Sequence, residues 1–302
     1  MAPTVLVTGG TGSIGSLLCE HLEKQGFEVS ILSRKKRKNS KYKTFVWNYK
    51  EHYIEPAAFE KCDHIIHLAG AGIADAAWTP ERKKEILDSR IRTTSLLYDF
   101  LASHEHHVKS IISASAVGYY GQVTSEAVFK EEDAPGNDFV ASVCKQWEEG
   151  VNKFSDLHIR TVNLRIGIVL MKKGGALEKM AQLFQYNVGS ALGSGKQFIP
   201  WVHISDLKDI VIQSVNSTEM KGAYNCCAPE PADNTKFSKS IARVLNKKIW
   251  LPNVPEFVLK IILGERAVLL TEGSKVSSAK IMETGFEFKF PNLEPALYDL
   301  LV

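Results

Sequence analysis

Three glycines, Gly9, Gly12 and Gly15, recur at every third position of the segment TGGTGSIG. Where a strand turns into a helix, such glycines permit a tight turn, let the backbone approach a pyrophosphate, and let helix and strand pack closely. The backbone N–H groups of Ser13, Ile14 and Gly15 would then point at the anion. The apolar VLVT before the segment and SIGSLLCEHL after it supply the required strand and helix. The sequence therefore predicts a dinucleotide site, with a ligand-free glycine turn as the alternative.

Cations follow the second apolar segment, where the chain reads Ser33, Arg34, Lys35 and continues the basic run to Lys38. An NAD site of this type places Asp or Glu there to bond the ribose 2′-OH, whereas an arginine accommodates a 2′-phosphate. The missing carboxylate favours NADP(H), with Arg34 as its main contact. Two alternatives remain, a nuclear-localisation or nucleic-acid patch and a solvated basic loop.

The composition of the whole chain is that of a globular protein. Its 302 residues are 44% hydrophobic and 24% charged, with a formal net charge of +3, which is too small to indicate nucleic acid as a partner. The five cysteines are scattered without a CxxC pair, as expected for reduced thiols. The N-terminus runs directly into a strand pattern, and we expect no membrane span. A cytoplasmic location follows, although an organelle protein without its transit peptide would look the same.

Short β-branched segments alternate with longer helical patterns, as in parallel βαβ units covered on both faces. We expect a doubly wound Rossmann α/β sheet in residues 1–170 and 198–226, with 198–215 returning to the main sheet. Residues 171–197 and 227–302 are expected to form a small α+β substrate lobe that includes a strand at 286–291. The expected strands of the first half lie at 5–10, 27–34, 63–70, 107–116 and 159–170, and its helices at 13–26, 81–103 and 138–154.

Four segments, TGGTGSIG, HLAG, ISASAVGYYG and WVHISDL, together resemble the extended short-chain dehydrogenase/reductase superfamily. More narrowly, the chain resembles the SDR39U1-type epimerase-like family, also described as NAD-dependent epimerase/dehydratase-like. The segments that carry this narrower resemblance span almost the whole chain: IADAAWTPERKKEILDSRI, SASAVGYYG, RIGIVL, GSGKQFIPWVHISDL and GERAVLLTEGSKV.

The resemblance directs attention to FVASVCKQWE, the start of the helix at 138–154. Active members of the superfamily carry Tyr-x-x-x-Lys on this helix, where the lysine lowers the pKa of the tyrosine that transfers a proton. One register puts Val140 and Cys144 at those positions, and the other puts Ala141 and Lys145 there. Neither register contains a tyrosine. We expect Cys144 to be a buried apolar residue rather than a nucleophile.

The resemblance implies substitutes for the missing pair. Ser115 falls at the catalytic-serine position and could bond a substrate oxygen, and Tyr119, with Tyr120, ends the same strand, where it could donate a proton or simply form a wall. The cofactor contacts implied by the resemblance are Leu68, Ala69, Gly70, Glu85, Arg90 and Val169, and a surface ion pair is the alternative for Glu85 and Arg90.

Three further side chains and one histidine-rich segment have an expected place in the structure. We expect Trp201 and Gln197 to face the substrate and Asp206 to cap a helix. The segment SHEHH matches no zinc spacing, so no metal is expected.

These observations favour an NADP(H)-binding oxidoreductase or epimerase-like protein of the short-chain dehydrogenase type, acting on an unknown small molecule. The alternative is a non-catalytic, NADPH-responsive regulator. We expect neither nucleic acid nor membrane as a partner, and a homodimer is the assembly to test.

Overall fold

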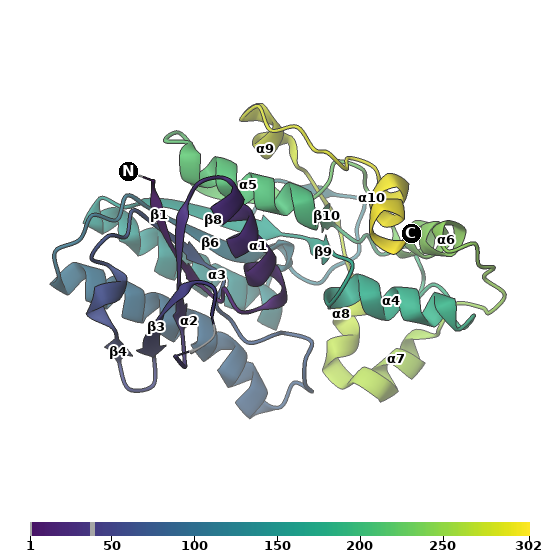
Figure 1. Ribbon diagram of the computed structural model, residues 1–302. Coiled ribbons are helices and arrows are strands. Elements are labelled where there is room, and N and C mark those ends of the chain that lie inside the picture. Colours follow the sequence, from purple (N-terminus) through teal and green to yellow (C-terminus); the bar gives the residue numbers. More distant parts are fainter. Residues whose placement is uncertain (1, 37–39) are drawn as a thin grey trace.

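The computed structural model describes residues 2–36 and 40–302, and its centre is an eight-stranded sheet in the order β11-β8-β6-β5-β1-β2-β3-β4 (Figure 1). The strand pairs are parallel except for β3 with the two-residue edge strand β4. The chain runs outward from β1 in one direction, crosses over, and continues outward from β5 in the other. This confirms the predicted Rossmann class. The strands are β1 (Thr4–Thr8), β2 (Glu28–Ser33), β3 (Lys43–Asn48), β4 (Tyr53–Ile54), β5 (His64–His67), β6 (Ser110–Ala116), β8 (Arg160–Ile166) and β11 (Gly222–Cys226).

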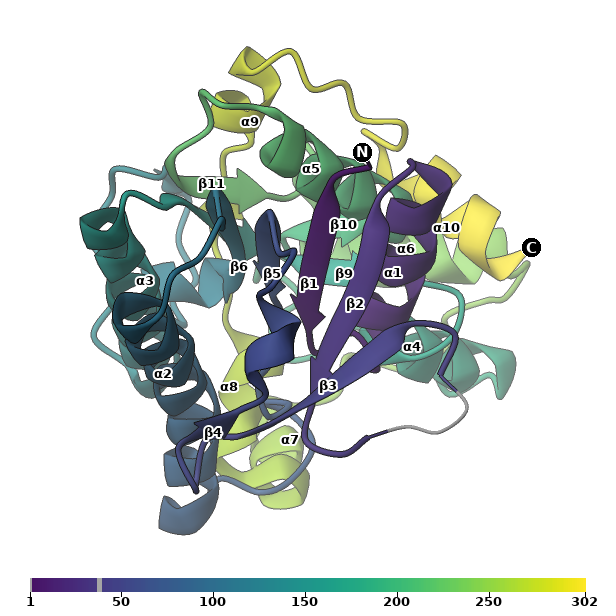
Figure 2. The ribbon, with the colours of Figure 1, turned by 60° about the vertical axis from the view of Figure 1, so that its left-hand side comes forward.

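Helices cover both faces of the sheet because its strands carry apolar side chains on both sides. On β1, Val5 and Val7 pack in one core cluster with helices α1 (Ser13–Lys24) and α5 (Ile204–Asn216), whereas Leu6 belongs to the opposite cluster. That second cluster contains residues of α2 (Pro80–Ser103) and α3 (Phe139–Asn152). Figure 2 shows α2 and α3 side by side on one face and α1 and α5 on the other.

A mainly helical C-terminal lobe lies beside the carboxyl ends of the central strands (Figure 1). A third core cluster joins its helices to a two-stranded sheet. That sheet pairs β9 (Ile168–Leu170) with β10 (Trp201–His203). The other elements are β7 (Val128–Phe129), α4 (Gly175–Gln185), α6 (Asn234–Val244), α7 (Glu256–Leu263), α8 (Val268–Thr271), β12 (Lys275–Val276), α9 (Ala279–Glu283) and α10 (Leu293–Leu301).

The expected single strand at 159–170 is wrong, because Gly167 separates β8 from β9. A Cβ at Gly167 would lie 2.7 Å from the carbonyl oxygen of Pro200, so a glycine permits the crossing of the two segments. After this point the chain leaves the main sheet. The segment 198–215 therefore pairs β10 with β9 rather than returning to the main sheet, and β11 makes that return instead.

The strand expected at 286–291 is also absent from the described structure, where this segment is irregular. Phe286 is buried with Ile281 of α9 in the core cluster that contains residues of α1 and α5. The backbone N–H groups of Lys289 and Phe290 donate to the carboxylate of Asp206, at 2.8 and 3.2 Å. The alternating aromatic pattern reflects this packing against α5.

The expectation that Asp206 caps α5 is therefore wrong. The cap is His203, whose Nδ1 accepts a 3.1 Å hydrogen bond from the backbone of Ser205.

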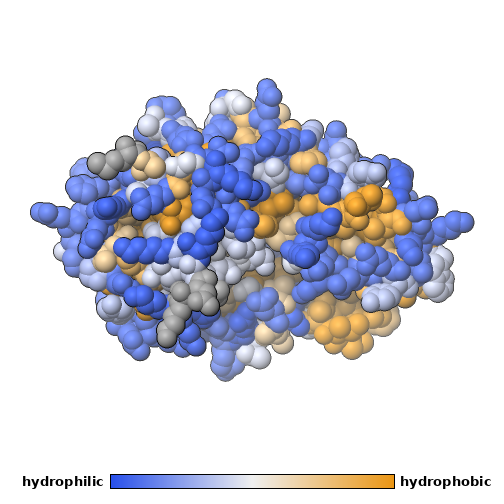
Figure 3. Space-filling view, viewed as in Figure 1, coloured by the Kyte–Doolittle hydropathy of each residue, from blue (hydrophilic) through white to orange (hydrophobic). Residues whose placement is uncertain are grey.

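Apolar side chains remain exposed on one part of the lobe surface. Phe257, Ile261 and Ile262 of α7 are 64%, 79% and 68% exposed. Figure 3 shows hydrophobic atoms gathered at the lower right, where Figure 1 places α7. None of the helices in residues 2–36 and 40–302 is long and apolar enough to cross a membrane.

Candidate nucleotide-binding site

The glycine turn between β1 and α1 has the form that the sequence predicts. Gly9 adopts a φ of +71°, and a Cβ at Gly15 would lie only 2.2 Å from the carbonyl oxygen of Gly9. Gly12 forms the amino-terminal cap of α1 with its backbone, no side chain bonds the cap, and no acidic residue occupies the first turn. The uncapped N–H groups that follow, from Ser13 onward, suit an anion.

Strand β5 ends directly beside this turn, at the point where the strand order reverses. A Cβ at Gly9 would lie 3.0 Å from the carbonyl of Leu68. The backbone N–H groups of Leu68 and Ala69 both donate to the hydroxyl of Thr8, at 3.2 Å. Open α/β sheets bind their ligands at such a switch point, so the structure places Leu68 and Ala69 where the sequence analysis expects the cofactor.

A buried histidine, the last residue of β5, connects this strand end to its neighbours. His67 is fully buried, with Nδ1 2.7 Å from the Thr8 hydroxyl and Nε2 3.1 Å from that of Thr94 on α2. Burial in front of Trp47 and Trp147 lowers the pKa of His67 to about 3, and the positive charge of Arg90 adds to the effect. His67 is thus a neutral linker between β1 and α2. His67 is not among the predicted site residues, because a lone histidine in a strand carries no spacing signal.

The cations at the end of β2 point into solvent. Arg34 and Lys35 are exposed, and neither belongs to an ion pair in the described part of the chain. Ser33 forms a local turn, in which its hydroxyl donates to the carbonyl of Lys35 at 2.7 Å and accepts the N–H of Lys35 at 3.2 Å. Arg34 and Lys35 are therefore available to a ligand. Arg37 and Lys38 of the same basic run lie outside the described residues.

Gly70 and Arg90 meet beyond the end of β5. A Cβ at Gly70 would lie 2.9 Å from Cζ of Arg90, whose Nη1 donates to the carbonyls of Ala71 and Ile86 at 3.0 and 2.9 Å. The guanidinium lies 5.1 Å from the ring centroid of Trp147. Arg90 thus braces the loop after β5.

Glu85 lies on the exposed side of the same helix. It forms a 2.7 Å ion pair with Arg82 and none with Arg90. The alternative of a surface ion pair between Glu85 and Arg90 is therefore wrong, because the partner of Glu85 is Arg82.

Ser115 donates a 2.6 Å hydrogen bond to the carboxylate of Glu148 on α3. Arg165 of β8 binds the same carboxylate twice, through Nε and Nη2, at 2.9 Å each. All three side chains are buried. The Ser115 proton is committed to this internal network, so a catalytic part for Ser115 stays a prediction that requires the hydroxyl to turn.

Tyr119 and Tyr120 lie in a short 3-10 turn, Val117–Tyr120, after β6 rather than on the strand itself. The guanidinium of Arg165 covers the ring of Tyr119 at 3.5 Å from its centroid. The hydroxyl of Tyr120 donates to Asn225 at 2.7 Å and accepts from Arg165 at 3.0 Å, and burial raises its pKa. Tyr120 is a structural member of the network, whereas the half-buried Tyr119 stays a candidate proton donor.

The face of α3 that would carry a Tyr-x-x-x-Lys pair is apolar and closed. Val140, Ala141 and Cys144 are buried, and burial raises the pKa of the Cys144 thiol to about 12. Lys145 points to solvent, 3.9 Å from Glu149. Cys144 is thus the buried apolar residue that was expected, and neither register of the motif has a tyrosine to transfer a proton.

A family model described as the NAD dependent epimerase/dehydratase family matches residues 5–227, and a domain of unknown function, DUF1731, matches 254–300. A relative named Epimerase family protein SDR39U1 homolog, chloroplastic, from Arabidopsis thaliana is 37% identical over 97% of this chain and 85% of its own. The Staphylococcus aureus Epimerase family protein SAR0825 is 34% identical over 98% of both chains.

This chain belongs to the NAD dependent epimerase/dehydratase family. Within it, the chain is an SDR39U1-type epimerase family protein.

Solved structures agree with this assignment. The crystal structure of human epimerase family protein SDR39U1 (isoform 2) with NADPH has a TM-score of 0.87 and 31% identity, with 98% of both chains covered. The UDP-N-acetylglucosamine 4-epimerase of Bacillus cereus has a TM-score of 0.79 at 20% identity, which shows the shared fold alone. The resemblance stated from the sequence is confirmed.

In this SDR39U1-type chain, the lobe meets the glycine turn near Ser13. A Cβ at Gly174 would lie 3.3 Å from the Ser13 hydroxyl, and half-buried Val169 packs between the cores of sheet and lobe. Trp201 and Gln197 do not face a substrate, since both are buried. The side-chain amide of Gln197 donates to the carbonyls of Leu192 and Leu270, at 2.9 and 2.7 Å, and so ties two loops of the lobe together. Trp201 belongs to the core cluster of the lobe, and the hydrogen bonds of Gln197 join segments distant in sequence, which the glycine-rich loop alone does not indicate.

Proposed function

We propose that this chain is an NADP(H)-binding oxidoreductase or epimerase-like protein that acts on a small molecule. One observation carries the cofactor assignment: Arg34 and Lys35 stand exposed and without an ion pair among the described residues, where an NAD-specific protein of this fold has a carboxylate. The human relative solved with NADPH supports the choice, because it is 31% identical over nearly the whole chain.

The residues present fit such a cofactor. The uncapped start of α1 would hold the pyrophosphate, Arg34 and Lys35 the 2′-phosphate, and Leu68 and Ala69 the adenosine side. NADP(H) supplies hydride transfer when bound. The chain itself would exclude water with Val169 and polarise a substrate oxygen with Ser115 or Tyr119, both near the carboxyl end of β6.

The closed face of α3 favours a second candidate function, an NADPH-responsive regulator without turnover. Val140, Ala141 and Cys144 leave no group there that can transfer a proton at neutral pH. Such a protein would bind the cofactor and present its lobe to a partner.

Titration with NADPH and NADH tests the cofactor assignment. We expect NADPH to bind at least tenfold more tightly than NADH, and the pair Arg34→Ala with Lys35→Ala to remove most of this preference. Lys24→Ala, at the far end of α1, is the matched control. Equal binding of both nucleotides by the wild-type chain would refute the assignment.

Consumption of NADPH on addition of a deproteinised small-molecule extract separates the two functions. An enzyme consumes the cofactor, and a regulator binds it and leaves it reduced. If Ser115 polarises the substrate, Ser115→Ala lowers the rate at unchanged NADPH affinity.

A further inference from the structure

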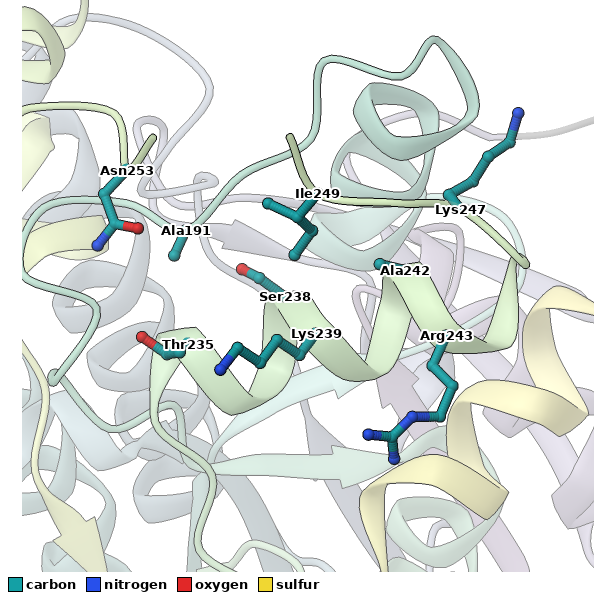
Figure 4. A pocket seen from close by; sticks show the side chains of 9 residues that line it. All are labelled: Ala191, Thr235, Ser238, Lys239, Ala242, Arg243, Lys247, Ile249 and Asn253. Atoms are coloured by element: carbon teal, nitrogen blue, oxygen red, sulfur yellow. The ribbon is translucent and has the colours of Figure 1, made fainter. Parts of the chain in front are cut away.

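A cavity of 490 Å³ lies along α6, in the part of the lobe remote from β1–β4 (Figure 1), and belongs to none of the features described above. Its volume is within the range of small-molecule sites. Figure 4 shows its nine lining side chains, three of which are cationic: Lys239, Arg243 and Lys247. None of the nine is acidic. We call this cavity the α6 pocket.

The end of α6 places the third cation above the helix. Asn246 adopts a left-handed φ of +53°, its N–H donates to the carbonyl of Arg243 at 3.0 Å, and the N–H of Lys247 donates to that of Ala242 at 2.7 Å. These two bonds form a Schellman turn, which ends the helix and brings the chain back over it. The backbone therefore fixes the main chain of Lys247 at the rim of the pocket, and Figure 4 shows its ammonium group directed away from Ser238 and Lys239.

A buried hydroxyl in the same wall has no partner. Ser238 is 1% exposed, and its Oγ makes no hydrogen bond to any described residue. Figure 4 shows this oxygen directed toward the space between Ala191 and Ile249. A buried hydroxyl without a partner costs about 1–3 kcal/mol, so a ligand that accepts its proton recovers that cost.

Other polar groups of the pocket are partly engaged and limit what the ligand can be. Arg243 pairs with Glu294, and the hydroxyl of Thr235 donates to the carbonyl of Gly195 at 3.1 Å. Lys239 and Lys247 take part in no ion pair within the described ranges. The free ammonium group of Lys239 and the free hydroxyl of Ser238 select an acceptor-rich anion, and Ile249 adds an apolar wall.

We propose that the α6 pocket binds a small phosphorylated molecule through its phosphoryl group, with Lys239 and Ser238 as donors. Phosphoryl oxygens accept from both ammonium and hydroxyl groups, and a phosphoryl anion suits a lining that contains cations and no carboxylate. This inference does not depend on the nucleotide site, which lies on the Rossmann sheet.

Calorimetric titration of the full chain with glycerol 3-phosphate, at fixed ionic strength and both with and without NADPH, tests the proposal. We expect binding in both conditions, weakened at least tenfold by Lys239→Ala and about three- to tenfold by Ser238→Ala. Lys248→Ala, next in sequence to Lys247 but outside the pocket lining, leaves the affinity unchanged. Thermal unfolding confirms that each variant is folded.

Titrations with inorganic phosphate and with chloride identify the part of the ligand that is recognised. If inorganic phosphate also binds and the same variants weaken its binding, the pocket recognises the phosphoryl group alone. Tighter binding of glycerol 3-phosphate than of inorganic phosphate indicates an additional contact with the apolar wall. Binding no stronger than that of chloride, or an equal loss in Lys248→Ala, overturns the proposal. If NADPH fails to bind while glycerol 3-phosphate binds, the assignment of the nucleotide site is refuted and the proposal for the α6 pocket is still supported.

Discussion

The hydroxyl of Ser115, near the carboxyl end of β6, lies 2.6 Å from the carboxylate of Glu148 on α3. The side chain at the expected catalytic position is therefore tied to the helix that lacks the usual Tyr–Lys pair. Arg165 completes the arrangement by holding the same carboxylate with two further bonds. The helix positions expected to carry that pair hold Val140 and Cys144 or Ala141 and Lys145, and the buried ion pair lies further along α3, at Glu148.

Breaking that ion pair on one side should destabilise the protein strongly. Glu148→Gln leaves the buried Arg165 charge without its carboxylate, and we expect a loss of about 3 kcal/mol in the free energy of unfolding. Denaturant titration measures it. The double variant Glu148→Leu with Arg165→Met removes both charges and should recover at least half of the loss. A loss below about 1 kcal/mol in the single variant would contradict this role.

Acid should weaken the fold through His67. Its pKa is about 3 in the folded protein and near 6.5 when unfolded, so between these values the unfolded chain binds an extra proton. The stability conferred by neutral His67 is complete above pH 6.5 and is lost as the pH falls toward 3, amounting to about 2 kcal/mol at pH 5.

The free energy of unfolding measured from pH 7.5 to 5 in wild type and His67→Gln checks this prediction. The variant should have the shallower slope, by about one proton. Parallel slopes for wild type and His67→Gln would exclude His67 as the source.

Gly15→Ala tests the cofactor turn. The added Cβ would lie 2.2 Å from the Gly9 carbonyl, so α1 must move away from β1. We expect NADPH affinity to fall at least tenfold and stability by about 1–3 kcal/mol. Gly12→Ala brings its Cβ no closer than 3.3 Å to the same oxygen and should cost less stability. The opposite ranking of stabilities would show that helix packing is not the reason for Gly15.

Thr8→Val should loosen the end of β5. The change removes the hydroxyl that accepts from Ala69 and is the partner of His67, while the N–H of Leu68 keeps the Thr8 carbonyl at 3.2 Å, so we expect a loss of about 2–3 kcal/mol. Thr8→Ser keeps the hydroxyl and should lose less than about 1 kcal/mol. Amide hydrogen exchange at Leu68 and Ala69 reports the local opening, and equal protection in both variants would contradict the assigned contact.

The sequence was informative wherever the function of a residue depends on local backbone. Gly9, Gly12 and Gly15 act through a turn seven residues long, and the βαβ rhythm follows from the apolar pattern of consecutive segments. The Ser115–Glu148–Arg165 network is different, because it joins β6, α3 and β8 over fifty residues. No spacing within one element indicates such a contact.

Two local patterns were misleading for physical reasons. The segment 286–291 alternates like a strand, yet its aromatic side chains fill gaps beside α5, and Asp206 occupies the backbone donors that a neighbouring strand would use. The apolar segment 159–170 looks continuous, but a close approach of Pro200 to Gly167 divides it. In each case a residue distant in sequence decides the structure.

The late return of β11 affects how the chain can be synthesised and shortened. Strand β8 ends at Ile166, and its outer neighbour begins only at Gly222, after the chain has built α4, β10 and α5. When only residues up to about 200 have left the ribosome, the edge of β8 still has unpaired backbone groups that can pair with a strand of another chain. Nascent chains and truncations that end before Cys226 should thus be prone to aggregate, and a chaperone that shields this edge would protect them during translation.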